Sequence, residues 1–469
     1  MSINSMIFLT AFLPVVFVLD RLCVRKTALK NILLLLASLV FYAWGEPIYI
    51  VLLLVSIAAN YGIGLLLGCQ RDESVAAKTV LAAGILVNLG ILGYKYFDFF
   101  LRIVNRLTGS EHEMRNIPLP IGISFFTFGA ISYLMDLYRG HYEAEKNPLN
   151  MALYLSFFPK ISVGPIARYR DFAPQLVNRQ ETVEKTAEGI RRFAYGLGKK
   201  VLVANIAGAS VDKIYAQDIT NVTGVMVWCA AILYAIQIYY DFSGFTDMAI
   251  GLGKMFGFDI CENFNYPYLS GSIQEFWRRW HISLSSWFRD YLYIPLGGNR
   301  KGKIRTYLNL AIVFFATGLW HGATTAFIAW GALHGFFIIV ERIGFKKILD
   351  KIGFLRYVYT GLVVLFGWVI FRVANLQPAL QYIRRMLTPW QYTQSTYALR
   401  ELIGNRCIVM AVVGVLGMGL LQVGIKRFCP TAEKLKGGVL ELVYCMFLIA
   451  ASMLLLVNGT YSPAIYLNF

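Results

Sequence analysis

The chain has 469 residues, of which 57% are hydrophobic, 15% are aromatic and 15% are charged, with a formal net charge of +17. A water-soluble surface of this size needs more charge, so the composition excludes a soluble globular protein and indicates a helical membrane protein. The positive charge is typical of basic cytoplasmic loops and of contact with anionic lipid, and no nucleic-acid-binding motif accompanies it.

The first part of the chain predicts five membrane spans. Residues 1–22 lack a basic n-region and a small-residue cleavage site, so we interpret them as a retained first span. The basic loop that follows should be cytoplasmic, which places the N-terminus outside the cell. Further spans are predicted near residues 31–45, 47–68, 79–100 and 117–137, because each is close to the roughly 20 apolar residues that cross a bilayer.

The next segment departs from this pattern. Three prolines and a glycine interrupt LYLSFFPKISVGPIARYRDFAPQL. Each proline removes a backbone hydrogen bond, and irregular backbone at membrane depth needs protein or water around it. We therefore predict a re-entrant or broken segment at residues 150–166. The stretch 188–206 is amphipathic and basic and is predicted to lie along the cytoplasmic face.

A span predicted at residues 222–240 runs into YYDFSGFTDMAIGLGKMFGF and places Asp241 and Asp247 at or near membrane depth. Later spans are predicted near 305–320, 324–341, 355–373, 406–425 and 438–458. The fold class is thus an all-α polytopic membrane protein with about ten or eleven transmembrane helices plus re-entrant and interfacial helices. No internal repeat or soluble segment is found, so residues 1–469 are predicted to form a single domain.

A charged and aromatic stretch, FWRRWHISLSSWFRDYLYIPLGGNR, occupies residues 276–300. We predict one helix over residues 277–291, with an aromatic face and a polar face. The aromatic face holds Trp277, Trp280, Leu284, Trp287, Phe288 and Tyr291. The polar face holds Arg278, Arg279, Ser283, Ser286, Arg289 and Asp290. This segment is too charged to span the bilayer, so it should lie at the interface or line a cavity.

Two histidines are candidates for chemistry. His281 falls on the aromatic face, where shielding from water favours the neutral, basic imidazole. It suits a general base or a group that aligns a thioester, and it equally suits a core histidine bonded to a backbone carbonyl. His321 ends an apolar run beside Trp320 and precedes small residues, which favours a functional role at membrane depth. His334 is interpreted as structural.

Other catalytic patterns are absent from the sequence. No HExxH, GxSxG, Walker or GxGxxG pattern stands in a suitable context. The seven cysteines are scattered without a CxxC pair, so no disulfide framework and no metal site are expected. Two classes of protein remain open from the residues alone: a transmembrane group-transfer enzyme that uses a histidine, and a secondary transporter whose path the same charges line.

Six long stretches occur in an order that is typical of one family. They are ASLVFYAWGEP (37–47), LPIGISFFTF (119–128), YLSFFPKISVGPIARYRDF (154–172), YYDFSGFTDMAIGLGKMFGF (239–258), ENFNYPYLSGSIQEFWRRWHISLSSWFRDYLYIPLGGNR (262–300) and TGLWHGATTAFIAWGALHG (317–335). By these stretches the chain resembles the membrane-bound O-acyltransferase (MBOAT) family, and within it the alginate O-acetyltransferase-like branch. The signature region covers about residues 120–340, and the C-terminal spans at 355–458 look generic.

The resemblance implies a ring of helices around a central tunnel that opens to the cytoplasm. It implies that His321, of the WHG motif, is catalytic, and that His281, of RRWHISLS, is the second catalytic residue, near the cytoplasmic mouth. Donor-binding or tunnel-lining roles are expected for Trp277, Arg278, Arg279, Trp280, Arg289, Asp290, Trp320, Asp241 and Asp247.

The resemblance also implies the reaction. The expected enzyme is an O-acetyltransferase of the bacterial plasma (inner) membrane, which moves an acetyl group from cytoplasmic acetyl-CoA towards an extracellular or periplasmic polysaccharide or cell-wall acceptor. No bound cofactor is expected. Expected partners are the lipid bilayer, the donor, an extracytoplasmic acetyltransferase of the SGNH-hydrolase type and the polymer. The alternative is a D-alanyl transfer protein of teichoic acid that uses a carrier-protein thioester; YIPLGGNR (293–300) favours O-acetylation.

Overall fold

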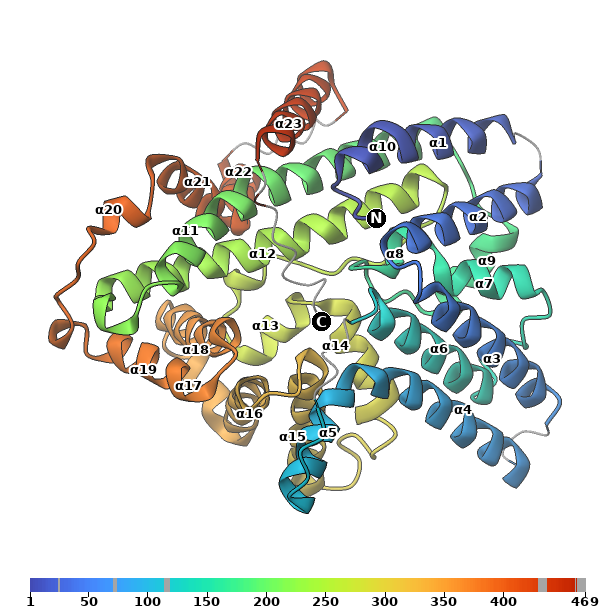
Figure 1. Cartoon of the computed structure of the whole chain (residues 1–469), viewed down its shortest axis with the longest axis horizontal. Helices are drawn as coiled ribbons and strands as arrows, with labels where there is room; N and C mark the ends of the chain where they lie inside the picture. Colours follow the sequence, from blue (N-terminus) through green and yellow to red (C-terminus); the bar gives the residue numbers. More distant parts are fainter. Residues whose placement is uncertain (24–25, 71–73, 114–118, 429–436, 460, 462–469) are drawn as a thin grey trace. The chain divides into compact units, whose positions relative to one another are not determined.

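The computed structural model describes residues 1–23, 26–70, 74–113, 119–428, 437–459 and 461. The described part consists of helices joined by turns and irregular segments, with no strand (Figure 1). The chain divides into two compact units. Unit 1 comprises the described residues of Met1–Phe193 and Phe245–Cys261, and unit 2 comprises those of Ala194–Gly244 and Glu262–Ile465.

In the described part of the chain, unit 1 begins with six α-helices of 10–19 residues. They are α1 (Leu13–Leu22), α2 (Thr27–Gly45), α3 (Ile50–Gly68), α4 (Val75–Gly93), α5 (Phe97–Thr108) and α6 (Ile123–Tyr138). Helices α3, α4 and α6 pack on one another. Small and polar residues explain this close packing: a Cβ on Gly64 would lie 2.5 Å from the Tyr133 hydroxyl, and the buried amides of Asn60 and Asn88 exchange hydrogen bonds of 3.1 and 2.7 Å between α3 and α4.

The proline-rich segment forms three short helices, α7 (Pro148–Ser156), α8 (Phe158–Ile161) and α9 (Tyr169–Val177). The predicted break is therefore confirmed. The side chains from Met151 to Arg168 are almost all buried, so protein surrounds the irregular backbone here, as it must in lipid.

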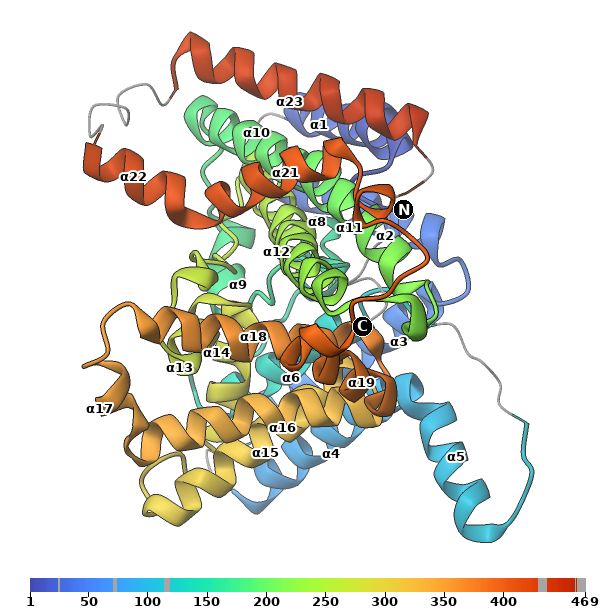
Figure 2. The same cartoon turned by 90° about the vertical axis from the view of Figure 1, so that its left-hand side faces the viewer.

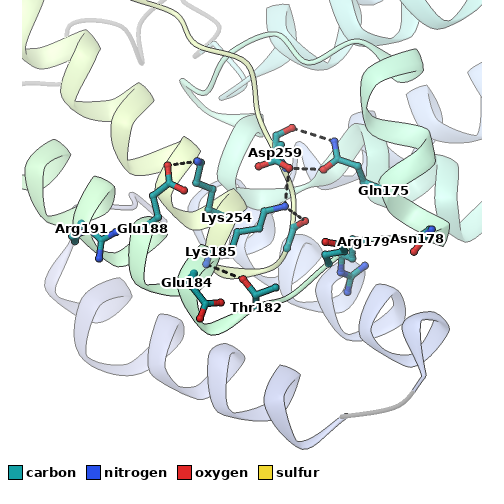
Figure 3. Close-up of a pocket in the computed structure, with 12 residues that line it drawn as sticks. Gln175, Asn178, Arg179, Thr182, Glu184, Lys185, Glu188, Arg191, Lys254 and Asp259 are labelled. Carbon is teal, nitrogen blue, oxygen red and sulfur yellow. Dashed lines mark hydrogen bonds and ion pairs between the residues drawn. The ribbon is translucent and has the colours of Figure 1, made fainter. Parts of the chain in front are cut away.

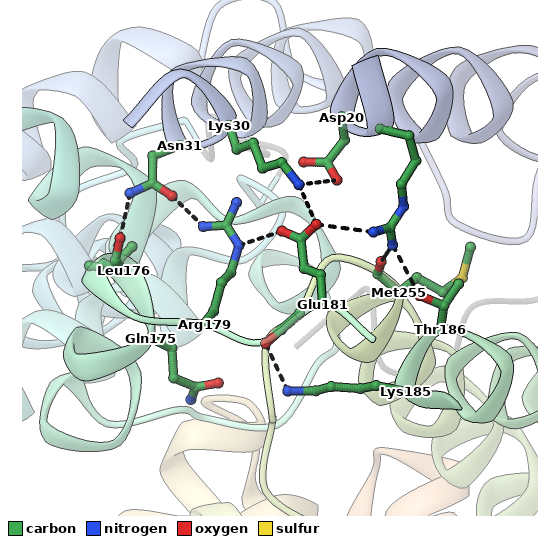
Figure 4. Close-up of polar contacts among 12 residues, drawn as sticks. Asp20, Lys30, Asn31, Gln175, Leu176, Arg179, Glu181, Lys185, Thr186 and Met255 are labelled. Carbon is green, nitrogen blue, oxygen red and sulfur yellow. Dashed lines mark hydrogen bonds and ion pairs between the residues drawn. The ribbon is translucent and has the colours of Figure 1, made fainter. Parts of the chain in front are cut away.

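A buried ionic network joins the start of unit 1 to the loop that follows α9 (Figure 4). The Glu181 carboxylate accepts hydrogen bonds from Arg21 at 3.0 Å, from Lys30, and from Arg179 at 3.0 Å. Burial alone would raise the pKa of Glu181, but the hydrogen bonds from Lys30 and Arg179 hold the pKa below its ordinary value of 4.5. Arg21 also donates to the Met255 carbonyl at 2.7 Å, which ties the end of α12 (Gly224–Met255) to α1.

Unit 2 contains the remaining helices. They are α11 (Asn205–Tyr215), α13 (Ile273–Arg279), α14 (Ile282–Phe288), α15 (Lys303–His321), α16 (Thr325–Val340), α17 (Lys346–Leu349), α18 (Leu355–Val373), α19 (Leu376–Leu387), α20 (Leu399–Leu402), α21 (Asn405–Val415), α22 (Leu421–Phe428) and α23 (Val439–Asn458). The unit boundaries fall within α10 (Val183–Gly198) and α12. The largest fully buried side chains of unit 2 are Trp280, Trp330 and Trp368, so its core is aromatic.

Eight helices in the described part are long and apolar enough to cross a membrane. They are Thr27–Gly45, Ile50–Gly68, Val75–Thr108, Gly224–Met255, Thr325–Leu349, Leu355–Val373, Asn405–Phe428 and Val439–Asn458. The spans predicted near residues 1–22, 117–137 and 305–320 are also helical, at 8–22, 123–138 and 303–321, without reaching the same combined length and hydropathy. The fold class predicted from the sequence is confirmed.

One predicted boundary is wrong. The span expected to end at residue 240 continues to Met255 as one helix of 32 residues, α12. Asp241 and Asp247 therefore lie inside a helix and not in a segment that follows a span. Both carboxylates pair with basic side chains, Asp241 with the buried Lys200 and Asp247 with the half-buried Arg192, as described below.

Candidate active site

The stretch predicted as one helix over residues 277–291 is broken in two. Helix α13 ends at Arg279 and α14 begins at Ile282, so the one-helix prediction is wrong. The break lies at His281, whose backbone adopts the left-handed conformation at φ 45° and ψ 56°. This conformation is uncommon for a residue with a side chain and persists only where surrounding structure holds it.

Residues 263–265 hold the break open. The Ile282 N–H donates to the Asn263 carbonyl at 3.0 Å, and the Asn265 N–H donates to the Arg279 carbonyl at 3.0 Å. These two bonds satisfy backbone groups that a continuous helix would have paired internally. The ENFNYP stretch thus stabilises the backbone break at His281.

The His281 imidazole is fully enclosed. His281 is 1% exposed. The centroid of its ring lies 4.7 Å from that of Phe242, in an edge-on contact, and 6.0 Å from that of Trp320. Burial lowers the pKa of His281 from 6.5 to about 3, so the imidazole is neutral at physiological pH. The predicted shielding is confirmed, although the polar partner is the Asn263 side-chain amide, at 3.1 Å from Nδ1, and not a backbone carbonyl.

His321 is the last residue of α15 and is 4% exposed. Its ring is enclosed by aromatic rings, with centroid distances of 4.6 Å to Trp320, 5.0 Å to Trp330 and 5.0 Å to Phe371. We call His281, Trp320, His321, Trp330 and Phe371 the histidine site. Trp320 contacts both histidine rings, so the structure brings together the two residues that the sequence predicts as catalytic.

Helices α15 and α16 position His321. They lie side by side (Figure 2) and approach closely because glycines face the contact. A Cβ on Gly318 would lie 2.5 Å from the Phe327 carbonyl oxygen, and one on Gly331 would lie 2.3 Å from the Phe314 carbonyl oxygen. Only glycine allows two helix backbones to approach to this distance. Thr324 caps α16 by accepting a hydrogen bond from the Phe327 N–H at 3.4 Å.

The aromatic contacts continue beyond the two catalytic candidates. Trp330 meets His334 at 5.1 Å and Trp277 at 5.6 Å, and His334 is completely buried. Neither nitrogen of His334 has a hydrogen-bond partner among the described residues. Trp280 joins the same core through Trp368 at 4.9 Å. The predicted residues Trp277 and Trp280 therefore belong to the wall around the site.

Most of the predicted charged residues of the stretch 276–300 form ion pairs with one another or with a neighbour. Arg279 forms an ion pair with Glu275 at 2.6 Å, and Arg289 forms one with Asp290 at 2.7 Å. Arg278 is exposed and forms no hydrogen bond or ion pair with the described part of the chain. Among these cations, Arg278 is the one that is available to an anionic ligand.

The two carboxylates of α12 neutralise basic side chains. Asp241 pairs with Lys200, and both side chains are 1% exposed. Asp247, in unit 1, accepts a hydrogen bond from Arg192 Nε at 2.7 Å. Asp241 adjoins Phe242, the ring that meets His281, so its relation to the histidine site is indirect. Their predicted donor-binding role stays a prediction.

Several residues of the site were not predicted. Trp330 was not predicted, and His334 was predicted only as a structural residue; the two are four positions apart on one helix, a spacing that points both side chains to the same face. Phe371 and Trp368 come from a span without a motif, and only the packing of α18 on α16 brings them to the site. Asn263 had no local signal, because its partner His281 is 18 residues away.

A polar cavity lies wholly in unit 1 (Figure 3). It is a cavity of about 710 Å³ lined by Gln175, Asn178, Arg179, Gln180, Thr182, Glu184, Lys185, Glu188, Arg191, Lys254, Gly257 and Asp259. Its lysines are paired within the cavity wall: Lys185 binds Asp259 at 2.7 Å, and Lys254 binds Glu188. Apart from Gly257, the residues that line the cavity are polar or charged, and they include none of the residues predicted as catalytic.

Comparison with known proteins identifies the class. The family model of MBOAT, the membrane-bound O-acyltransferase family, matches residues 143–377, which include both histidines of the site. The chain belongs to this family. It is therefore an O-acyltransferase and a multi-pass membrane protein, and the transporter alternative is removed.

Individual relatives extend the match over most of the chain. The "Probable alginate O-acetylase AlgI" of Pseudomonas aeruginosa is 42% identical over 430 residues, covering 90% of this chain and 82% of that protein. The peptidoglycan O-acetyltransferase of Helicobacter pylori is 36% identical, covering 82% of this chain and 79% of that protein. The teichoic acid D-alanyltransferase of Bacillus subtilis is 30% identical, covering only 48% of this chain and 59% of that protein.

Proposed function

We propose that this enzyme transfers an acetyl group from acetyl-CoA on the cytoplasmic side of a bacterial inner membrane to an extracytoplasmic polysaccharide or cell-wall polymer. The observation that carries the proposal is the pairing of two buried histidines, His281 and His321, against the shared ring of Trp320 in a membrane O-acyltransferase. The names of relatives that match over most of the chain support the proposed acyl group and acceptor class.

In the proposed mechanism, the acceptor hydroxyl attacks the thioester carbonyl of the donor. The neutral imidazole of His321 takes the hydroxyl proton as the new C–O bond forms. The C–S bond then breaks, and the thiolate leaves and is protonated, so the products are an acetyl ester and free coenzyme A. His281 acts on the donor side. The indole and phenyl rings exclude bulk water, which protects the thioester from hydrolysis.

The donor's phosphates need a cation outside the aromatic core. Arg278 is exposed and available, whereas Arg279 and Arg289 have carboxylate partners. We therefore assign donor-phosphate contact to Arg278 first.

Transfer across the membrane requires no transported solute, because donor and acceptor reach one site from opposite sides. An extracytoplasmic SGNH-type acetyltransferase is the proposed onward partner, and the N-terminus is proposed to lie outside.

A donor-competition assay tests the proposal. Purified protein in lipid vesicles receives radiolabelled acetyl-CoA or a carrier protein loaded with labelled D-alanine, and label transfer to hydroxyl acceptors is measured. The expected result is transfer from acetyl-CoA, with a raised KM for acetyl-CoA in Arg278→Gln and little change in Lys301→Gln, a variant of an exposed cation of the following loop. Transfer from the carrier protein alone would replace acetylation with D-alanylation, as the match to D-alanyltransferases allows.

A further inference from the structure

We propose that Asn263 is a positioning residue that fixes the tautomer of His281, so that Nδ1 carries the proton and Nε2 presents a lone pair to the histidine site. The inference rests on the proposed function, because it assigns the state in which His281 works. It concerns a residue that lies 18 positions before the histidine and outside the FWRRWHISLS stretch.

The orientation of the Asn263 amide is determined by its partners. Its Oδ1 lies 3.1 Å from the backbone nitrogen of Ser283 and 2.9 Å from the Ser283 hydroxyl. A backbone N–H is only a donor, so the atom that faces it must be an acceptor. The atom is therefore the amide oxygen, and the flipped orientation, with Nδ2 against the Ser283 N–H, is excluded.

The same oxygen fixes the histidine. His281 Nδ1 lies 3.1 Å from Asn263 Oδ1. An amide oxygen accepts and cannot donate, so Nδ1 must carry the hydrogen. A neutral imidazole has one N–H, so Nε2 is unprotonated. Nε2 is buried and has no hydrogen-bond partner among the described residues, which leaves its lone pair available to a reactant.

This assignment restricts what His281 can do. An unprotonated Nε2 can accept a proton or a hydrogen bond, but it cannot donate a hydrogen bond to a thioester carbonyl. In the resting enzyme His281 is therefore an acceptor of a proton or hydrogen bond and not a hydrogen-bond donor to the thioester, a choice that the sequence leaves open. Histidines in functional sites are commonly oriented this way, by a second group that holds the other ring nitrogen.

The charged surroundings of His281 favour its neutral form. The rings that face it, Phe242 of α12 and Trp320 of α15, carry no charge, and Asn263 and Ser283 are neutral. On α12 the charged residue next to Phe242 is Asp241, which forms an ion pair with Lys200 of the segment Lys199–Ala204. On the elements beside it, Arg278 is exposed, Arg279 pairs with Glu275, and Arg289 pairs with Asp290. Among the described residues, no carboxylate forms an ion pair or hydrogen bond with the ring that would stabilise an imidazolium.

Nitrogen-15 NMR of histidine-labelled protein tests the tautomer directly. The His281 signals are identified by their loss in His281→Ala. The expected wild-type spectrum shows an unprotonated nitrogen coupled to both ring C–H protons, which identifies Nε2. In Asn263→Leu, which keeps the branched shape and removes the acceptor, the signals should shift towards a mixture of tautomers. A wild-type His281 protonated on Nε2 would overturn the proposal.

The pH profile of acetyl transfer separates positioning from a merely structural role. In Asn263→Asp the new carboxylate faces Nδ1–H and stabilises an imidazolium, so the acid limb of the profile should move up by about one pH unit or more. Activity should return at higher pH. Asn263→Leu should lose about tenfold or more at every pH, and Asn405→Asp, at an exposed position at the start of α21, should change nothing.

The outcomes distinguish the two proposals. Equal losses in Asn263→Asp and Asn263→Leu with an unchanged profile would overturn the positioning role and leave the acetyl-transfer function intact. A confirmed tautomer together with full activity in His281→Ala would instead remove His281 from the proposed mechanism.

Discussion

At the scale of single residues, the site contains two buried histidines, and burial keeps His281 neutral. His281 shows the physical cost: an imidazole with a pKa of about 3 in the folded protein and 6.5 outside it binds its proton more weakly when the protein is folded. Between about pH 3 and pH 6.5, His281 binds a proton in the unfolded chain but not in the folded protein. The penalty from His281 is therefore absent above about pH 6.5, and the free energy of unfolding decreases as the pH drops below this value.

The loss of stability at low pH gives a testable prediction. Lowering the pH from 7 to 5 should cost the folded protein about 2 kcal/mol through His281 alone. The His281→Phe variant, which keeps a ring in the pocket and cannot titrate, should lose that part of the pH dependence. Thermal unfolding in detergent at several pH values measures it. Identical pH slopes in the two proteins would contradict the assigned burial; His112→Phe, at an exposed position, is the matched control.

At the scale of elements, the α15–α16 hairpin determines where His321 lies. An added methyl group at Gly318 or Gly331 would overlap a backbone carbonyl of the neighbouring helix, and backbone cannot yield as a side chain can. Gly318→Ala and Gly331→Ala should therefore each cost about 1–3 kcal/mol of stability and lower acetyl transfer by displacing His321. Gly361→Ala, on α18 with nothing within 4 Å, is the control. Wild-type activity in both hairpin variants would show that the site does not depend on this approach.

The ionic network of unit 1 makes a second prediction at this scale. Glu181→Gln leaves Arg21, Lys30 and Arg179 without their shared carboxylate, which should destabilise the protein by about 3 kcal/mol. The pKa of Glu181 is lowered by folding, so its contribution is present above about pH 4.5 and is lost as the pH falls through the folded value. Unfolding measured from pH 7 to pH 4 should show the loss converging at the acid end. Glu184→Gln, at an exposed position three residues on, should be neutral; an equal effect of both substitutions would refute the role of the network.

Local sequence patterns predicted some features of this structure, whereas others depend on tertiary packing. Apolar runs predicted α18 and α23 almost to the residue, since each length is determined by a continuous hydrophobic stretch. The break at His281 could not be predicted from helical periodicity, because the bonds that hold it come from residues 263–265. Phe371 and Asn263 reach the site through tertiary packing alone. The motifs predicted His281 and His321, and the structure adds the rings and the amide that hold them.

At the scale of the whole molecule, the chain is a multi-pass membrane O-acyltransferase whose chemistry is assigned to one enclosed pair of histidines. Everything else in the proposed reaction depends on His321 acting on the acceptor.

The most direct test is acetylation of the extracytoplasmic polymer by cells that carry His321→Ala, compared with cells that carry His112→Ala, at an exposed loop position. Both proteins should reach the membrane in equal amounts. The account predicts that polymer acetyl ester falls to background in His321→Ala and stays at the wild-type level in His112→Ala. Wild-type acetyl content in His321→Ala would contradict the account.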